Sequence, residues 1–178
     1  ERYDPTTVVH LAWASTAASN YQSLPENAEW ALATRDFIDE CVQREIWLVG
    51  TGSAVDDDDG SGESTPYIQA KKMLRMYADQ FIQGQERLTW LRPQYVVSIV
   101  DARPSVIRSF VQAHDPSRFQ PRNPADALDF IEVRDVASGI LTVICNEIFG
   151  NVYLGSGSLH TVSQLLSAVS PSRYESAS

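Results

Sequence analysis

The sequence predicts an α/β protein: a parallel sheet flanked by helices, with part of a small lobe toward the C-terminal end. Short β-branched runs alternate with longer segments whose apolar residues recur at helical spacing. This alternation is typical of βαβ units, whose strands run parallel. Of the 178 residues, 43% are hydrophobic and 10% aromatic, which is enough to form a core and excludes disorder as the main state.

The first half of the chain predicts three strands and two helices. Residues 7–12 and 46–49 are short, apolar and β-branched, as buried strands are. Between them, residues 26–44 carry apolar side chains at helical spacing after Pro25. Pro66 favours a helix start, because proline is tolerated in the first turn, and this helix is expected over residues 66–83. Residues 88–91 form the third strand, which Pro93 ends, and the acidic residues 56–63 are expected to form a solvated loop.

The second half repeats the same alternation with shorter elements. We expect helices at residues 104–112, 135–148 and 161–169, and strands at residues 130–133 and 151–154.

Composition excludes several kinds of function. The 14 Lys and Arg residues against 23 Asp and Glu give a formal net charge of −9, so a nucleic-acid partner is not expected. No apolar run is long enough to span a bilayer, and no membrane partner is expected. Cys41 and Cys145 are expected to be buried, inert thiols of a cytoplasmic protein. The three histidines have no metal-ligand spacing, so no metal site is expected.

Tyr67 and Lys71 are the first candidate for chemistry. Residues four apart on a helix share one face, and a lysine ammonium near a phenol stabilises the phenolate and lowers its pKa. Such a tyrosine can transfer a proton to or from a hydroxyl or carbonyl. On the spacing alone, an amphipathic surface pair is the more frequent explanation.

Ser53 strengthens the catalytic interpretation. It follows the strand at residues 46–49, and ligands of open α/β sheets bind at the carboxyl ends of the strands. A hydroxyl at that place can hydrogen-bond the oxygen that Tyr67 protonates, although a strand-ending turn also uses serine. A nucleophile elbow is excluded, because Thr51 and Val55 occupy the positions of its two glycines.

Six segments in chain order resemble the extended short-chain dehydrogenase/reductases, the NAD-dependent epimerase/dehydratase family of nucleotide-sugar enzymes. Their order is more specific than any one of them. They are V-V-H-L-A at residues 8–12, L-V-G-T-G-S at 48–53, the Y-x-x-x-K pair Tyr67 and Lys71, L-R-P at 91–93, D-F-I-E-V-R-D-V-A at 129–137, and L-G-S-G at 154–157.

The resemblance implies a mechanism and a set of residues. A hydride would pass between a sugar carbon of a nucleotide-sugar substrate and the nicotinamide of NAD or NADP, with Tyr67 as acid/base. Lys71 would bind the nicotinamide ribose and hold down the pKa of Tyr67, and Ser53 would orient the substrate oxygen. The cofactor-binding residues implied are His10, Leu11, Ala12, Tyr67, Lys71 and Pro93.

The resemblance also implies a domain division and an assembly. Residues 1–100 would form an incomplete Rossmann-type cofactor domain carrying the catalytic Ser, Tyr and Lys. Residues 101–178 would be mainly a substrate lobe with returning Rossmann elements. A homodimer would form through the helices at residues 26–44 and 66–83, which carry more apolar residues than one buried stripe needs.

One family feature does not occur in this sequence. Family members open with a strand, a G-x-x-G-x-x-G turn and a helix that together hold the cofactor pyrophosphate. The 178 residues begin at a segment resembling the fourth strand and contain no such turn; after G-S-G at residues 155–157, His160 takes the place of the third glycine. We therefore expect residues 1–178 alone to bind the cofactor weakly. The alternative to an enzyme is a non-catalytic binding or scaffold relative of the same fold.

Overall fold

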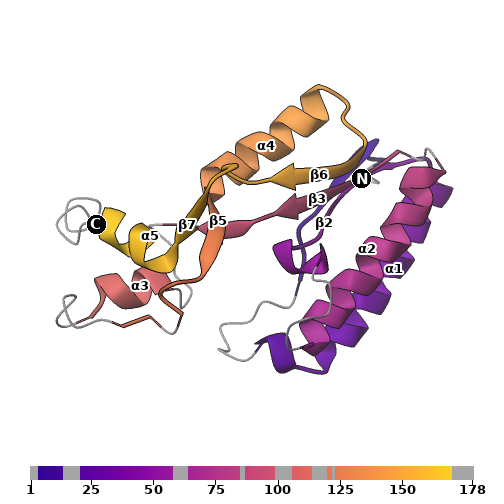
Figure 1. The fold of residues 1–178 in the computed structure, drawn as a ribbon. Coiled ribbons are helices and arrows are strands. Elements are labelled where there is room, and N and C mark those ends of the chain that lie inside the picture. Colours follow the sequence, from indigo (N-terminus) through magenta and orange to yellow (C-terminus); the bar gives the residue numbers. More distant parts are fainter. Residues whose placement is uncertain are drawn as a thin grey trace. The chain divides into compact units, whose positions relative to one another are not determined.

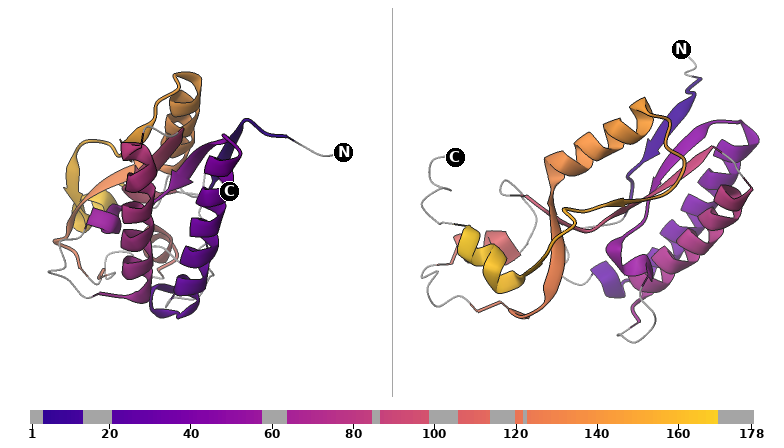
Figure 2. Two further views of the ribbon diagram at one scale, coloured as in Figure 1. Left: turned by 90° about the vertical axis from the view of Figure 1, so that its right-hand side faces the viewer. Right: turned by 45° about the horizontal axis from the view of Figure 1, so that its top comes forward.

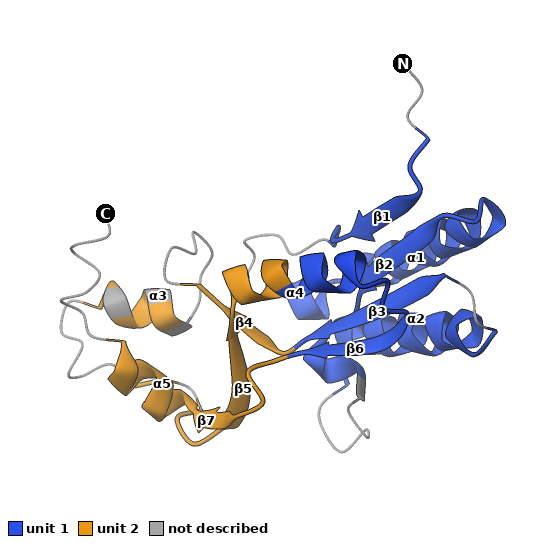
Figure 3. Ribbon diagram, turned by 90° about the horizontal axis from the view of Figure 1, so that it is seen from above, with its two compact units in different colours: residues 1–93, 139–154 blue, residues 94–138, 155–178 orange. Residues whose placement is uncertain are grey.

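The structure, a computed structural model, describes residues 4–13, 21–57, 64–84, 87–98, 106–113, 120–121 and 123–169. The chain divides into two compact units, shown in Figure 3. The first contains residues 1–93 and 139–154, and the second contains residues 94–138 and 155–178. All the residues that the sequence singled out for chemistry belong to the first unit.

The first unit is built on a four-stranded parallel sheet, which confirms the predicted fold class. The strand order is β1-β2-β3-β6, and every neighbouring pair is parallel. The central strands β2 and β3 are buried along nearly their whole length, as strands covered on both faces are. The strands are β1 (Thr7–His10), β2 (Trp47–Thr51), β3 (Leu88–Pro93) and β6 (Gly150–Leu154).

Two long helices of the first unit lie side by side, as Figures 1 and 2 show: α1 (Glu26–Gln43) and α2 (Pro66–Gln83). The Thr65 side chain caps α2 by accepting a hydrogen bond from the Ile68 N–H (3.3 Å), and Pro66 occupies the first turn. The buried side chains between helices and strands include Ile38, Leu74 and Trp90, and they form the main hydrophobic cluster.

The second unit contains a three-stranded sheet and short helices. Strand β5 (Ala127–Glu132) lies between β4 (Tyr95–Val97), which is parallel to it, and β7 (Leu159–Thr161), which is antiparallel. Helix α3 (Val106–Val111) precedes β5, and α5 (Val162–Ala168) follows β7. Helix α5 begins with a capping box between Thr161 and Gln164.

Helix α4 (Val133–Cys145) begins in the second unit and ends in the first. It starts two residues earlier than predicted, directly after β5, and it ends before the predicted boundary at residue 148. Strands β4 and β7 were not predicted, because three-residue runs are too short to show a period. The sheet elements and the helices α1 and α2 otherwise agree with prediction within a few residues.

Two expectations about burial were wrong. Cys41 is buried, but Cys145 is exposed at the end of α4. Asp56 is 5% exposed rather than solvated, because it pairs with a buried arginine; the rest of the predicted acidic loop, from residue 58, lies outside the described residues. Over the part of the chain that is described, the helices are either too short or too polar to cross a membrane.

Candidate active site

The candidate site lies where strands β1 and β2 end and helix α2 begins. Ser53 follows β2 by two residues, and Tyr67 and Lys71 project from the first turns of α2. The turn containing Ser53 is fixed to the neighbouring strand, because the Gly52 N–H donates to the Leu91 carbonyl (2.7 Å). This is the edge of a parallel sheet at which ligands bind.

The structure brings Ser53 and Tyr67 into contact. The Tyr67 hydroxyl donates to the Ser53 Oγ over 3.3 Å. Ser53 Oγ also accepts from the Val55 N–H (3.5 Å), at the start of the 3-10 turn η2 (Ala54–Asp57). The two hydroxyls can therefore both reach one substrate oxygen.

Tyr67 is surrounded by aromatic rings. The rings of Trp13 and Tyr21 meet it edge to face, with centroids 6.1 Å and 5.3 Å away. Burial disfavours the phenolate and raises the pKa of Tyr67 to about 12, despite the opposing hydrogen bond with Ser53. Tyr67 is thus a protonated phenol at neutral pH, and it holds its proton more tightly than a free phenol does.

Lys71 is almost completely buried, with 5% of its surface exposed. Its ammonium donates to the Thr51 carbonyl (3.2 Å) at the end of β2 and lies 3.8 Å from the ring centroid of Trp13. Burial lowers the pKa of Lys71 to about 8, although the Asp56 carboxylate favours the charged form. The carbonyl and the indole face thus cover much of the ammonium and leave little of Lys71 open to a ligand.

The expected effect of Lys71 on Tyr67 was not found. The Lys71 ammonium is 5.9 Å from the Tyr67 ring centroid and is directed toward Thr51 and Trp13. The pKa of Tyr67 is raised rather than lowered, because burial of the phenol outweighs the other contributions. The helical i, i+4 spacing brings the two residues to the same site, but it does not place the ammonium beside the phenol oxygen.

Trp13 was missed at the sequence level, although it contacts both functional side chains. Its indole N–H donates to Asn27 Oδ1 (3.0 Å), and Asn27 in turn donates to the carbonyls of Tyr21 (2.7 Å) and Leu24 (2.8 Å). Asn27 is 2% exposed at the start of α1. A tryptophan shortly after a strand is an ordinary core residue in sequence, and nothing local reveals its partners across the fold.

The residues expected to contact a cofactor are distributed along the edge of the sheet. His10 ends β1 with its ring against Phe37 (5.3 Å), and burial together with the Lys71 charge lowers its pKa. Leu11 and Ala12 follow and are exposed. Pro93 ends β3, two strands away, where it pairs with Leu154 of β6. The structure therefore places His10, Leu11 and Ala12 at the end of β1, and Pro93 at the end of β3.

Asp56 is the second residue of the site that the sequence analysis did not predict. It accepts hydrogen bonds from the Ser53 N–H (3.1 Å), the Trp90 indole N–H (3.3 Å) and Arg92 Nε (2.5 Å). Arg92 is 1% exposed, lies over the Tyr153 ring, and donates to the Tyr153 hydroxyl. In sequence Asp56 opens an acidic run, and its ion-pair partner Arg92 lies 36 residues away on strand β3.

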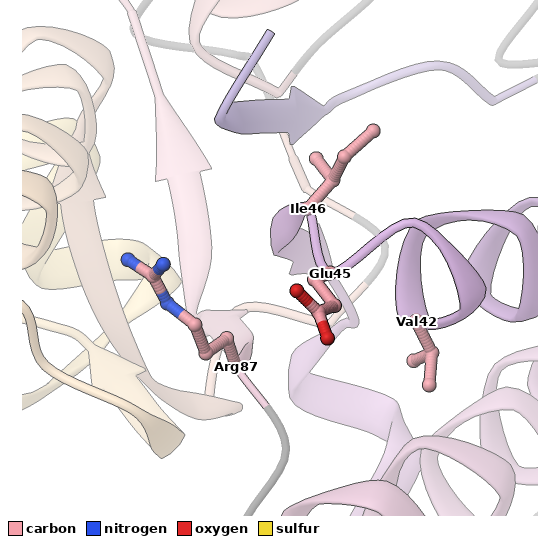
Figure 4. A pocket seen from close by; sticks show the side chains of 4 residues that line it. All are labelled: Val42, Glu45, Ile46 and Arg87. Carbon is pink, nitrogen blue, oxygen red and sulfur yellow. The ribbon is translucent and has the colours of Figure 1, made fainter.

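A cavity at the opposite ends of the strands does not provide a comparable site. Figure 4 shows it, with a volume of about 280 Å³, lined by Val42, Glu45, Ile46 and Arg87. The Arg87 guanidinium points away from the Glu45 carboxylate and lies 5.9 Å from the Phe149 ring. Within the described ranges, moreover, no group of three or more His, Cys, Asp or Glu side chains could hold a metal ion.

Comparison with solved structures relates this fold to enzymes of nucleotide sugars. UDP-glucose 4-epimerase of Thermus thermophilus, in complex with NAD, is 20% identical with a TM-score of 0.65, covering 92% of this chain and 60% of the epimerase. MoeE5, in complex with UDP-glucuronic acid and NAD, is 22% identical with a TM-score of 0.69, covering 91% and 60%. A double mutant of DesIV, a dTDP-glucose 4,6-dehydratase of Streptomyces venezuelae with NAD bound, is 16% identical with a TM-score of 0.69, covering 92% and 56%.

The chain shares the Rossmann-type fold of these epimerases and dehydratases. It spans about 60% of their length. The resemblance found in the sequence is thereby confirmed for the fold. No family model matches the sequence, and no curated protein matches it.

Proposed function

We propose that this chain carries the acid/base site of an NAD(P)-dependent enzyme that epimerises, dehydrates or reduces a nucleotide-linked sugar. The observation that carries the proposal is the hydrogen bond from Tyr67 to Ser53 (3.3 Å) at the carboxyl end of β2, with the buried Lys71 one helical turn away. The fold shared with nucleotide-sugar epimerases and dehydratases supports it. The reaction class would be oxidoreduction or isomerisation in the cytoplasm.

Each residue of the site has a distinct role in the proposed reaction. Ser53 Oγ accepts from Tyr67 now and would bind the substrate oxygen together with it. Tyr67, whose pKa is about 12, would donate its proton as a carbonyl oxygen becomes a hydroxyl, and would recover it in the reverse step. The Lys71 ammonium would stabilise the phenolate formed after donation, which requires it to turn from Trp13 toward Tyr67.

The buried donors fit the nicotinamide end of NAD or NADP in chemical type. A phenol and an ammonium can both hydrogen-bond hydroxyls of a ribose, and Lys71 and Tyr67 would hold it, with His10, Leu11, Ala12 and Pro93 along the sheet edge. The cofactor, when bound, supplies hydride transfer. The Trp13 indole now covers the Lys71 ammonium at 3.8 Å and must move before a ribose reaches it.

The test uses the natural protein that contains this chain, incubated with NAD and either UDP-glucose or dTDP-glucose. Chromatography of the sugar products is expected to show conversion, and Tyr67→Phe is expected to lower kcat by about 10²–10⁴-fold while cofactor binding persists. The matched control is Tyr77→Phe on the same helix, whose hydroxyl donates to Asp39 (2.5 Å). Near-normal kcat for Tyr67→Phe removes Tyr67 from the mechanism.

A non-catalytic relative is the second candidate, and two observations favour it. Trp13 occupies the face of Lys71, and the pKa of Tyr67 is raised to about 12 instead of being tuned toward neutrality. Calorimetry on the natural protein decides between the two candidates. Binding of NAD(H) or NADP(H) supports the enzyme, and binding of a nucleotide sugar without any cofactor supports the scaffold.

We also propose that the protein forms a homodimer through α1 and α2. Exposed apolar side chains gather there, including Trp30, Met73 and Met76, of which Met76 is 70% exposed. A cavity of about 590 Å³ lies beside them, lined by residues of both helices such as Arg35 and Tyr77. An isologous pairing of two such helix pairs would cover the apolar side chains.

A further inference from the structure

The buried carboxylate of Asp56 connects strand β3 to the turn that carries Ser53. Its Oδ1 accepts from Arg92 Nε (2.5 Å), while its Oδ2 accepts from the Ser53 N–H (3.1 Å) and the Trp90 indole (3.3 Å). The side chains of Asp56 and Arg92 in this ion pair are 0% and 1% exposed. One carboxylate thus joins two side chains of β3 to the turn that follows β2.

Gly50 in β2 and Gly52 directly after it allow the Trp90 and Asp56 side chains to come close to the backbone. A Cβ at Gly52 would overlap both the Asp56 carboxylate and the Trp90 indole, and a Cβ at Gly50 would overlap the Trp90 ring. The Trp90 ring therefore lies close to the backbone of both glycines, with its N–H directed at Asp56. Arg92 is held from its other side by Tyr153, whose hydroxyl accepts from it.

Stability alone does not account for such a pair. Burying two charges costs several kcal/mol per ion, and apolar replacements of a buried pair are often neutral or stabilising. A hydrogen bond from a backbone N–H to a carboxylate is instead strong and directional, so it fixes the donor. The donor here is the backbone of the residue whose hydroxyl meets Tyr67.

We propose that Asp56, locked by Arg92, is the positioning residue that aims the Ser53 hydroxyl at Tyr67. The proposal rests on the proposed function, because a positioned serine matters only where Tyr67 and Ser53 share a substrate oxygen. The proposal gives β3 an indirect role in the reaction, because Arg92 of this buried strand holds Asp56 in place.

The Asp56 charge also acts on the neighbouring groups. It favours the Lys71 ammonium and disfavours the Tyr67 phenolate. Among the described residues, His10 at the end of β1 and Tyr21 also interact with these two groups, and Tyr21 disfavours the phenolate.

The test compares two double variants in the natural protein. Asp56→Ala/Arg92→Met removes the acceptor and leaves no unpaired charge, whereas Asp56→Asn/Arg92→Gln keeps an acceptor oxygen near the Ser53 N–H. Hydrogen exchange of the assigned Ser53 amide, followed by NMR, is expected to accelerate about tenfold or more in the first variant and much less in the second.

Turnover is expected to follow the same order. The alanine–methionine variant is expected to lose about 10²-fold in kcat with little change in KM, as misplaced catalytic groups do, and the asparagine–glutamine variant is expected to recover much of the loss. The matched control is Glu40→Gln/Arg44→Gln, which removes an exposed ion pair of 2.5 Å on α1 and is expected to change neither readout.

The outcomes separate this proposal from the proposed function. A folded alanine–methionine variant with unchanged Ser53 exchange and unchanged kcat overturns the positioning role. A rapidly exchanging Ser53 amide in the unaltered protein overturns it as well, without any variant. Absence of turnover in the unaltered protein refutes the enzyme, and the Ser53 amide still decides whether Asp56 holds the turn.

Discussion

Lys71 carries a charge that its surroundings only partly favour. Its ammonium has one carbonyl and one indole face in place of water, and its pKa is lowered to about 8. A depression of this size from 10.5 corresponds to about 3 kcal/mol of unfavourable burial of the charged form. Buried groups with shifted pKa values are frequent at functional sites. Such a shift makes the free energy of unfolding depend measurably on pH.

The stability of the protein is therefore expected to rise with pH relative to Lys71→Met. Between the folded pKa of about 8 and the unfolded value near 10.5, the unfolded chain binds more protons at Lys71, so the free energy of unfolding increases with pH. Denaturant titrations at pH 7 to 10 should show the stability advantage of Lys71→Met shrinking. The control Lys72→Met, at the next and less buried position, accounts for the general effect of removing a lysine charge from α2.

Trp13 is expected to control the ionisation and access of Lys71. In Trp13→Ala, water replaces the indole, and the pKa of Lys71 should return toward 10.5 because the desolvation is relieved. Competitive acetylation with peptide mass spectrometry measures this, with Lys72 as the internal reference. An unaltered Lys71 titration in a folded Trp13→Ala variant contradicts the covering role of the indole.

At the scale of single residues, the sequence predicted that Ser53 and Tyr67 share a site, and it missed the contacts of Asp56 and Trp13. Ser53 at a strand end and Tyr67 at a helix start meet because the sheet edge brings them together. Asp56 lies three residues after Ser53, but its ion pair with Arg92 crosses the fold, and the bond from Trp13 to Asn27 joins the segment after β1 to α1, so the sequence pattern indicated neither. Even for Lys71, spacing predicts the helix face but not the direction in which a flexible side chain turns.

Helices α1 and α2 bury apolar side chains against the sheet and also carry exposed apolar side chains. Phe81 packs against the core cluster and against Tyr77 (5.3 Å), whereas Met73 and Met76 are exposed. Methionine-rich exposed faces adapt well to a partner. The prediction of a dimer therefore depends on the methionines and Trp30 rather than on Phe81.

Met76→Glu is expected to favour the monomer, because a charge at a 70% exposed apolar position would be buried without a partner in the dimer. Sedimentation velocity at micromolar concentration measures the change. Leu141→Glu, at a 61% exposed position on α4, is the control and should leave the assembly unchanged. A protein that sediments as a monomer before any substitution contradicts the proposed dimer.

The two units of the molecule differ in how deeply their side chains are buried. In the first unit Val49, Leu88 and Leu91 are 0% exposed, whereas the most buried apolar residues described in the second, Ile107 and Leu166, are 3% and 6% exposed. Sequence reasoning predicted the long helices and buried strands of the first unit well. It was weaker for the second, whose three-residue strands depend on tertiary pairing.

Native-state hydrogen exchange is expected to show different amide exchange rates in the two units. Amides of β2 and β3 should exchange most slowly, while those of β5 and β7 should exchange through smaller openings, since fewer buried contacts protect them. NMR or mass spectrometry of the intact protein measures both. Equal protection in the two units would contradict this gradient.

The pairing of β3 with β6 has a consequence for the order of events during synthesis on the ribosome. Thr89 donates to the Ile148 carbonyl (2.6 Å) and accepts from the Trp47 indole (3.0 Å), so a buried bond of the early strands closes only on a late segment. Residues 94–138 must emerge before that segment does, and β3 waits meanwhile with one edge uncovered. The nascent chain therefore exposes the unpaired edge of β3 while residues 94–138 are being translated, and a pause within that segment would prolong the exposure.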